Sequence, residues 1–507
     1  MTANLFNAFA PAFKNADRPA LRLADGRVIT YGQLEQEAAR FANLLRAEGV
    51  MPGDRVAVQV DKSAENVFLY LACLQAGTVY LPLNTAYTDR ELDYFFGDAE
   101  PRLIVCKPER ADGIRKLASS QGVTIHTLDA SGGGSLMQAA AGQSTDSQTV
   151  RRVAGDLAAI LYTSGTTGRS KGAMITHGNL QANAETLIEA WGISGRDVLL
   201  HALPIYHVHG LFVALNTCLM VGAEILFHEK FETGAVLEDL PTSTMMMGVP
   251  TFYTRLLSSG RLNADVCRNM RLFIAGSAPL LDETFREFEQ KTGHAILERY
   301  GMTETGMLCS NPLHGERRPG TVGPPLADVE VRVADEQGSI LDKGEVGVLE
   351  VRGPNVFKGY WRMPEKTKEE FREDGFFITG DVSLIEPDGY VRIVGRAKDM
   401  IISGGFNVYP KEIEQVIDQC DGVIESAVIG LAHPDFGEGV AAVIAAAGGG
   451  LDKEAVVAAC RAELAAYKVP KAVFVVEALP RNTMGKVQKN QLRDRYAGTF
   501  TSGGEPA

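Results

Sequence analysis

The junction between an apolar run and a stretch of small residues constrains this chain most. Residues 157–163 (LAAILYT) are mostly apolar, and 163–168 (TSGTTG) contain only Thr, Ser and Gly. Small residues let the backbone approach a ligand closely, so that N–H groups and hydroxyls can cradle phosphate oxygens beside a lysine charge. The stretch does not match G-x-x-x-x-G-K-[ST], and its alternative interpretation is an ordinary turn. The candidate phosphate contacts are Thr163, Ser164, Gly165, Thr166, Thr167, Gly168 and Lys171.

The pattern of apolar residues changes twice along the chain. In the first 150 residues, helical and strand patterns alternate, with Thr30 and Gln33 forming a capping-box pair, which predicts a mostly parallel α/β sheet. From about 320 to 395, alternating apolar and polar residues predict a smaller antiparallel β unit, and an α+β pattern follows. We therefore predict an α/β and α+β protein. Its parts are an N-terminal domain (1–395), a hinge (396–399), a small C-terminal domain (400–497) and a disordered tail (498–507).

Composition excludes several classes of protein. The 507 residues are 45% hydrophobic and 22% charged, which supports a large core and excludes a disordered or collagen-like chain. A net charge of −13 argues against a general nucleic-acid or anionic-membrane binder. The seven cysteines are scattered without a C-x-x-C pair, as expected for reduced thiols rather than a disulfide framework or zinc site. With no secretory signal and no apolar run of about 18 residues, we expect a cytoplasmic protein without a membrane anchor.

Six segments together resemble one known family. The stretch TSGTTGRSKG is similar to the phosphate loop of the adenylate-forming superfamily, which includes acyl-CoA synthetases, peptide-synthetase adenylation domains and luciferases. Other segments follow in the family's order, so the resemblance extends from 163 to 486. It implies a large AMP-binding domain with a small mobile lid, and an acid–thiol ligase that activates a carboxylic acid with ATP. The other segments are PIYHVHG (204–210), GSAPL (276–280), ERYGMTE (298–304), TGD with GRAKDMIISGG (379–381 and 395–405) and PRNTMGK (480–486).

The resemblance implies roles for individual residues in forming an acyl-adenylate. Glu304 would bind Mg²⁺ with Thr163 nearby, because magnesium usually takes only one or two protein carboxylates beside substrate phosphates. Thr303 would contact the α-phosphate and Tyr300 the adenine. Lys486 would neutralise the reacting carboxylate and phosphate. The remaining implied ATP contacts are Asp381 and Arg396 at the ribose, with Gly276, Ser277, Ala278, Glu298, Arg299, Gly301 and Met302.

The family's second step implies further roles. Coenzyme A would displace AMP after the small domain rotates about Lys398. Gly404, Gly405 and Phe406 would then flank the pantetheine tunnel, where paired glycines tolerate close approach. A protein lysine acetyltransferase acting on Lys486 would inactivate the enzyme, because acetylation removes the charge.

Polar residues in the acyl-pocket segments predict the substrate. Arg299 stands where acyl-CoA synthetases more commonly carry glycine, and Arg255 follows the pocket segment 249–254. His207, also a predicted catalytic residue, and Ser277 lie in the other two pocket segments. Because arginine pairs bidentately with carboxylates, we expect a short dicarboxylate, malonate first and methylmalonate second. The alternative is that the arginines form structural ion pairs, and the sequence leaves open which one contacts substrate.

Other functions remain open at this point. His207 and His209 resemble half of a metal site, but no third ligand follows at suitable spacing. The chain could instead adenylate another short carboxylic acid, or load a separate carrier protein. A non-catalytic nucleotide-binding module is the third alternative, which the presence of Thr303, Glu304 and Lys486 disfavours. We therefore expect ATP, coenzyme A and a small carboxylic acid as ligands.

Overall fold

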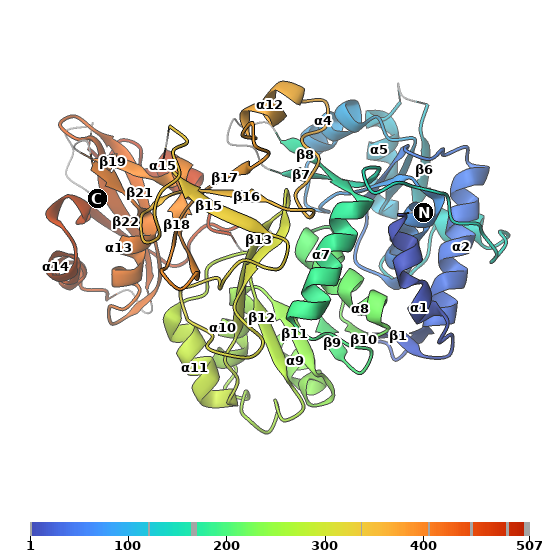
Figure 1. Cartoon of the computed structure of the whole chain (residues 1–507), viewed down its shortest axis with the longest axis horizontal. Coiled ribbons are helices and arrows are strands. Elements are labelled where there is room, and N and C mark those ends of the chain that lie inside the picture. The colour runs from blue at the N-terminus through green and yellow to red at the C-terminus, as the bar shows by residue number, and fades with distance from the viewer. Residues whose placement is uncertain are drawn as a thin grey trace. The chain divides into compact units, whose positions relative to one another are not determined.

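The computed structural model describes residues 3–119, 122–163, 170–335, 337–403, 406–446, 450–482 and 486–500. The chain divides into two compact units (Figure 1). The first comprises Met1–Glu330 and Val351–Phe377, and the second comprises Val331–Glu350 and Ile378–Ala507. The four-stranded sheet belongs mostly to the second unit, and the domain boundary and hinge at 396–399 stay a prediction.

A six-stranded sheet in the first unit carries the residues that lead into the predicted phosphate loop. Its neighbours are parallel except for the antiparallel pair β7–β8, which confirms the predicted mostly parallel sheet. The predicted capping box is also confirmed: Thr30 accepts from the Gln33 backbone N–H at the start of α2 (Tyr31–Ala47). Helix α3 (Ala64–Ala76) is buried along its whole length. The strand order is β6 (Thr124–Thr127), β5 (Leu103–Cys106), β3 (Arg55–Gln59), β4 (Val79–Pro82), β7 (Leu157–Thr163) and β8 (Lys171–Thr176).

An eight-stranded sheet forms the other half of the first unit. Its inner strands are parallel, and the antiparallel pairs β13–β14 and β1–β2 lie at its two ends. Ligands in such sheets bind beyond the carboxyl ends of the parallel strands. Segments from the sequence-predicted pocket follow β9, β11 and β12 at that edge. The order is β14 (Gly306–Ser310), β13 (Leu297–Met302), β12 (Leu272–Ala275), β11 (Met245–Gly248), β9 (Val198–His201), β10 (Glu224–Phe227), β1 (Pro19–Leu23) and β2 (Val28–Thr30).

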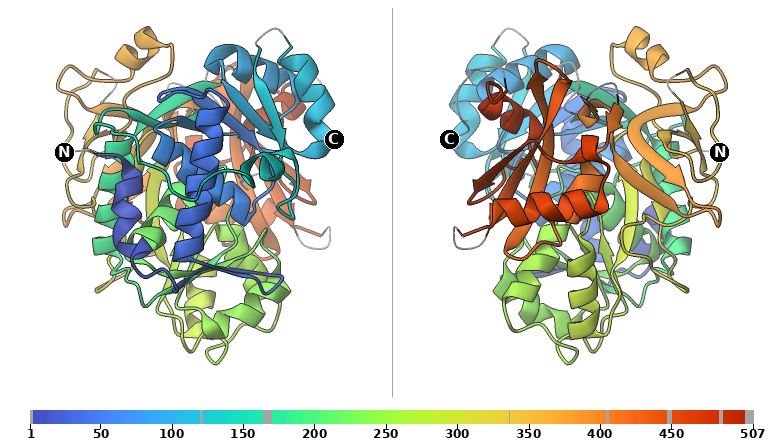
Figure 2. Two further views of the ribbon diagram at one scale, coloured as in Figure 1. Left: turned by 90° about the vertical axis from the view of Figure 1, so that its right-hand side faces the viewer. Right: turned by 90° about the vertical axis from the view of Figure 1, so that its left-hand side faces the viewer.

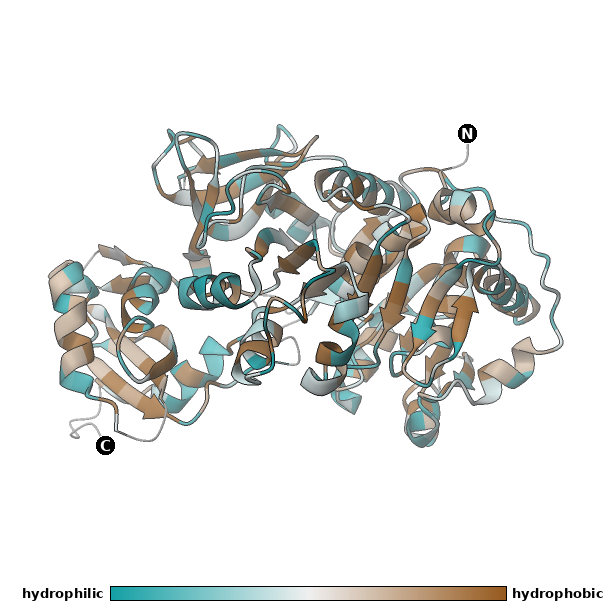
Figure 3. Cartoon of the chain, turned by 90° about the horizontal axis from the view of Figure 1, so that it is seen from below, coloured by the Kyte–Doolittle hydropathy of each residue, from teal (hydrophilic) through white to brown (hydrophobic). Residues whose placement is uncertain are grey.

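Helices cover these sheets with apolar faces. Tyr253, Phe273 and Phe288 form the centre of one core beside β11 and β12, and apolar residues concentrate along the strands in Figure 3. No helix in the described part of the chain combines the length and hydropathy needed to span a bilayer. The remaining longer helical segments of this unit are α1 (Ala10–Phe13), α4 (Asp89–Ala99), α5 (Ala111–Leu117), α6 (Ser135–Ala140), α7 (His177–Ala190), a π-helix (His209–Leu215), α8 (Asn216–Val221), α9 (Thr233–Asp239), α10 (Pro250–Ser258), α11 (Asp282–Thr292) and α12 (Pro364–Glu369).

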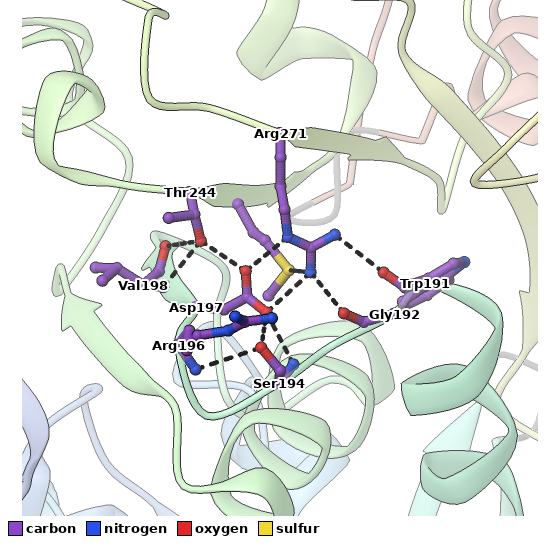
Figure 4. Close-up of polar contacts among 9 residues, drawn as sticks. Trp191, Gly192, Ser194, Arg196, Asp197, Val198, Thr244 and Arg271 are labelled. Carbon is purple, nitrogen blue, oxygen red and sulfur yellow. Dashed lines mark hydrogen bonds and ion pairs between the residues drawn. The ribbon is translucent and has the colours of Figure 1, made fainter.

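A polar cluster ties together the amino ends of β9, β11 and β12 (Figure 4). The Asp197 carboxylate accepts from Arg271 Nε at 2.6 Å and Nη2 at 2.9 Å, and from the Thr244 hydroxyl at 2.9 Å. The Ser194 backbone N–H adds a bond of 2.8 Å. Burial alone would raise the pKa of Asp197, but these hydrogen bonds hold it below its usual value. The cluster therefore fixes one end of the strands whose other ends lead to the pocket segments.

The second unit contains two sheets. In the five-stranded sheet, α13 and α14 cover one apolar face and α15 covers the other (Figure 2). Phe500 lies 5.1 Å from His433 between ring centroids, so 498–500 pack on this unit, whereas 501–507 of the predicted tail lie outside the described residues. The elements are β15 (Glu330–Ala334), β16 (Gly347–Arg352), β17 (Phe377–Ile385), β18 (Val391–Arg396), β19 (Ile401–Ser403), β20 (Phe406–Val408), α13 (Pro410–Ile417), β21 (Val423–His433), β22 (Gly437–Ala446), α14 (Lys453–Glu463), β23 (Ala472–Val476) and α15 (Lys489–Tyr496). Together the four sheets confirm the predicted α/β and α+β class.

Candidate active site

Thr163 and Glu304 lie together in the first unit. Thr163 ends β7, Glu304 follows β13, and the Thr163 hydroxyl donates to Glu304 Oε1 at 3.2 Å. Glu304 is buried at 5% exposure. The described residues hold no group of three or more His, Cys, Asp or Glu side chains placed to bind a metal ion. One carboxylate with one hydroxyl nevertheless fits Mg²⁺, which takes most of its ligands from water and substrate phosphates.

Lys171 is held by an acidic partner that sequence reasoning missed. Its Nζ lies 2.8 Å from Glu370 Oε1 and 4.0 Å from the centroid of the Tyr360 ring. The Tyr360 hydroxyl lies 2.7 Å from Glu370 Oε2 and 3.3 Å from Glu304 Oε1. Burial, together with both carboxylates, raises the pKa of Tyr360, so the hydroxyl keeps its proton and bridges the two acids. Lys171 therefore anchors β8 beside the predicted metal ligand, and its contact with phosphate stays a prediction.

The predicted loop contacts themselves are not all visible. Ser164, Gly165, Thr166, Thr167 and Gly168 lie outside the described residues. Their flanks, Thr163 and Lys171, pair across the antiparallel β7–β8 ladder. The two ends of the predicted phosphate loop are therefore fixed on adjacent strands.

A second cluster surrounds Arg299. This residue is 4% exposed on β13, and its guanidinium packs against Gly276 just beyond β12. An added Cβ at Gly276 would lie 2.4 Å from Arg299 Cζ, so only glycine leaves space for the guanidinium. Next to it, Ser277 has φ +72° in the left-handed region, and its Oγ lies 3.3 Å from His209 Nδ1. Three separate segments thus meet around one arginine.

This second cluster has unused hydrogen-bonding atoms. Among the described residues, Arg299 Nε and Nη2 and His209 Nε2 are buried without a hydrogen-bond partner. Burial lowers the pKa of Arg299 to about 9. Burial, followed by the nearby Arg299 charge, lowers the pKa of His209 well below its usual value, so its imidazole is neutral. Buried donors without partners cost free energy, and a ligand that accepts hydrogen bonds would recover it. The cluster is therefore suited to an anionic acceptor such as a carboxylate.

The other two predicted pocket residues differ in their positions. Arg255 is exposed on α10, and its role in substrate binding stays a prediction. His207 Nδ1 accepts from the His209 backbone N–H at 3.3 Å, and the role of His207 also stays a prediction. Sequence reasoning missed the contact between His209 and Ser277, for which the only signal was the second histidine of PIYHVHG.

The end of β13 carries the remaining predicted nucleotide contacts of this unit. Tyr300 pairs with Cys309 and Gly301 with Met307 in the β13–β14 ladder, and a Cβ at Gly301 would lie 2.0 Å from the Gly306 carbonyl oxygen. Glu298 is buried, whereas Tyr300, Gly301, Met302 and Thr303 are partly exposed, as is Ala278 beyond β12. Their contact with ATP stays a prediction.

In the second unit, Asp381 and Arg396 face each other. They are paired residues of β17 and β18, with Arg396 Nε 2.5 Å from Asp381 Oδ1. Lys398 is exposed in a short 3-10 turn, Ala397–Asp399. Phe406 is 55% exposed and stacks on Tyr467 with ring centroids 4.6 Å apart, whereas Gly404 and Gly405 lie outside the described residues.

The predicted catalytic lysine, Lys486, is exposed in the second unit. Its backbone N–H donates to Asn482 Oδ1 at 2.9 Å, and its carbonyl accepts from the Asn482 N–H at 2.9 Å. Lys489 anchors the following helix through Glu414, with Nζ 2.6 Å from Oε1. These contacts fix the base of the segment that presents Lys486.

Comparisons with known proteins define the class. The chain matches the AMP-binding enzyme family over residues 9–361 and the AMP-binding enzyme C-terminal domain over 412–486. The chain therefore belongs to the AMP-binding enzyme family, and it is an acid–thiol ligase of the AMP-forming type. This confirms the class that the six sequence segments indicated.

Three known proteins show how similar this chain is to individual relatives. The ATP-bound MatB structure from Rhodopseudomonas palustris is 56% identical and has a TM-score of 0.97, covering 99% of this chain and 100% of that chain. A malonate–CoA ligase of Arabidopsis thaliana is 34% identical, covering 96% of this chain and 87% of its own length. A feruloyl-CoA synthase of an Amycolatopsis species is 36% identical, covering 93% of this chain and 94% of its own length.

Proposed function

We propose that the protein converts malonate, ATP and coenzyme A into malonyl-CoA, AMP and pyrophosphate, with methylmalonate as a secondary substrate. The buried guanidinium of Arg299 carries this proposal, because it lies beside Ser277 and His209 with donors that no described protein group satisfies. A fatty-acyl pocket would need apolar walls at this place. The similarity to MatB and to a malonate–CoA ligase supports the same substrate.

The first step forms malonyl-adenylate. One malonate carboxylate oxygen attacks the α-phosphorus of ATP, a new P–O bond forms, and the bond to the β-phosphate breaks to release pyrophosphate. Arg299 holds the other carboxylate and so orients the reacting one, which lowers the entropic barrier. We assign Thr303 and Lys486 to stabilise the charge that develops on the α-phosphate, and Asp381 and Arg396 to hold the ribose.

Glu304 and Thr163 would hold Mg²⁺, whose positive charge would offset the negative charge on the phosphate oxygens. The Tyr360 hydroxyl, 3.3 Å from Glu304 Oε1, helps to hold this carboxylate through the same oxygen that Thr163 contacts.

The second step transfers the acyl group. The sulfur of coenzyme A attacks the malonyl carbonyl, the C–S bond forms, the bond to AMP breaks, and the thiol proton is lost. Gly404, Gly405 and Phe406 are assigned to the pantetheine tunnel and Lys398 to the hinge. We place the reaction in the cytoplasm, where the seven free cysteines would stay reduced.

The test is AMP release with acetate, malonate, methylmalonate, succinate and hexanoate, each with free coenzyme A. We expect malonate to give the highest kcat/KM, and Arg299→Ala to lower that value by about 100-fold or more, since an arginine–carboxylate pair is lost. Arg255→Ala in the same assay tests whether the exposed arginine also contacts the diacid. Equal use of hexanoate by the wild type, or an unchanged kcat/KM for malonate in Arg299→Ala, would refute the diacid assignment.

A further inference from the structure

A buried lysine and a buried histidine lie near the acyl cluster, by which we mean Arg299, Ser277 and His209. Lys62, between β3 and α3, is 8% exposed, and His201, the last residue of β9, is 1% exposed. Lys62 Nζ lies 2.7 Å from His201 Nδ1 and 2.8 Å from the His201 carbonyl oxygen. The same Nζ is 4.2 Å from the centroid of the Phe227 ring. No carboxylate in the described residues forms an ion pair with Lys62, although the charge of Glu229 acts on it electrostatically.

These contacts determine the tautomer of His201. Burial lowers the pKa of Lys62 well below its usual value, but both the ammonium and the neutral amine can donate to His201 Nδ1. The Gly210 carbonyl oxygen beside Nε2 can only accept, so Nε2 carries the proton and Nδ1 accepts from Lys62. Burial, followed by the Lys62 charge, lowers the pKa of His201 well below its usual value, so the ring is neutral. Its single proton is then on Nε2, which lies 2.9 Å from the Gly210 carbonyl oxygen and donates to it.

The acceptor belongs to the segment that carries His209. Gly210 is the second residue of the π-helix His209–Leu215, a conformation that often occurs at functional sites. A Cβ at Gly210 would lie 2.1 Å from the Pro204 carbonyl oxygen, so the backbone here is closely packed on one side. On another side, the hydrogen bond from His201 Nε2 fixes the Gly210 carbonyl oxygen. His209 precedes Gly210 directly, so the position of its ring depends on this carbonyl.

We propose that Lys62 and His201 are positioning residues for acyl-group recognition: Lys62 holds the His201 ring with its Nε2–H towards Gly210, and that N–H sets the π-helix so that His209 meets Ser277 beside Arg299. The inference rests on the proposed function for the identity of the acid. The chain of contacts from Lys62 to Gly210 does not depend on that identity.

Two substitutions of His201 separate the two nitrogen atoms. In His201→Gln, the side-chain amide reaches the position of Nε2 and can donate to Gly210, but Lys62 loses its side-chain acceptor and keeps only the carbonyl oxygen of residue 201. In His201→Asn, the shorter amide reaches only the position of Nδ1, so Lys62 keeps an acceptor and Gly210 loses its donor. We expect His201→Asn to raise the KM for malonate by about fivefold to tenfold, the effect of one lost hydrogen bond. His201→Gln should stay within about twofold of the wild type.

Lys62→Met tests the contact that holds the ring. Without a donor at Nδ1, the His201 ring is less firmly held, so its Nε2–H bond to Gly210 weakens. We expect a rise in the KM for malonate similar to that of His201→Asn, while the KM for ATP stays within about twofold. Methionine leaves His201 Nδ1 and the His201 carbonyl without their donor, so the melting temperature should fall, and both KM values are compared at a temperature where every variant is folded. In His201→Gln there is no imidazole ring for Lys62 to hold. The double variant Lys62→Met/His201→Gln should therefore have the same KM for malonate as His201→Gln.

Three results would overturn the proposal. The first is equal KM values for malonate in His201→Gln and His201→Asn. The second is a rise in the KM for ATP as large as that for malonate, which would indicate a general structural defect. The third is a nitrogen-15 NMR spectrum of wild-type protein in which His201 carries its proton on Nδ1. If the wild type instead uses another acid from the panel, the proposed function fails, and the same variants and the NMR measurement still test the positioning role with that acid.

Discussion

The Arg299 guanidinium occupies the space that a side chain at Gly276 would fill, with Cζ only 2.4 Å from the position of the missing Cβ. Backbone between β12 and the following turn therefore forms one wall of the guanidinium site. The relationship links a residue predicted from the nucleotide segment to one predicted from the acyl pocket, and it suggests a direct experiment.

Gly276→Ala should displace the guanidinium without removing it. We expect kcat/KM for malonate to fall by more than about tenfold, because a shift of about 1 Å in a positioning group can cost 100-fold. The measurement is AMP release at varied malonate concentration. Gly97→Ala is the matched control, since an added Cβ there meets nothing within 4 Å. Wild-type kinetics in Gly276→Ala would show that the guanidinium position is unimportant.

The Asp197–Arg271 pair should make stability depend on acid pH. The native pKa of Asp197 lies below its unfolded value, so its stabilisation is complete above the unfolded pKa, near 3.8, and is lost as the pH falls through the lower native pKa. Asp197→Asn should lower stability near neutral pH, by about 1–3 kcal/mol, because Arg271 and Thr244 lose a charged acceptor. Denaturant unfolding from pH 7 to pH 3 measures this. A wild-type and a variant curve that stay parallel throughout would contradict it.

The Lys171–Glu370 pair should be energetically coupled. Lys171 is 8% exposed, so removing Glu370 leaves a largely desolvated charge, whereas removing Lys171 leaves Glu370 with Lys366, 3.3 Å away. We expect Lys171→Met and Glu370→Gln each to destabilise the protein, and the double variant to cost less than their sum, with a coupling of about 0.5–3 kcal/mol. Chemical denaturation of all four proteins measures the cycle. Additive effects would show that the pair contributes no net interaction.

Lys486 should act in only one of the two steps. Lys486→Ala should abolish pyrophosphate release from ATP and malonate, yet largely spare thioester formation from supplied malonyl-adenylate, because the charge is needed where phosphate charge develops. Single-turnover assays of each step provide the measurement. Equal losses in both steps would refute the assignment.

Acetylation tests the same charge by another route. Protein carrying acetyl-Lys486 should behave like Lys486→Ala, since acetylation removes the charge and keeps most of the side chain. Full activity of homogeneously acetylated protein would exclude a regulatory role for a lysine acetyltransferase.

Local sequence patterns predicted the fold better than they predicted the site. The Thr30–Gln33 capping box and the strand at 157–163 depend on neighbouring residues, so the sequence reveals them directly. Arg255 and Arg299 could not be ranked, because only the packing of the eight-stranded sheet places one on an exposed helix face and buries the other.

The polar pairs of the site were missed for a related reason. Lys171 and Glu370 are 199 residues apart, and Lys62 and His201 are 139 residues apart. Such contacts arise only when separate sheets and helices assemble. No motif within a short window of sequence indicates them.

Ser277 holds its hydroxyl beside His209 in a backbone conformation that favours glycine, with φ +72°. Glycine at this position would relax the backbone but would remove a polar contact beside Arg299. Backbone stability and recognition of the acid therefore favour different residues at position 277.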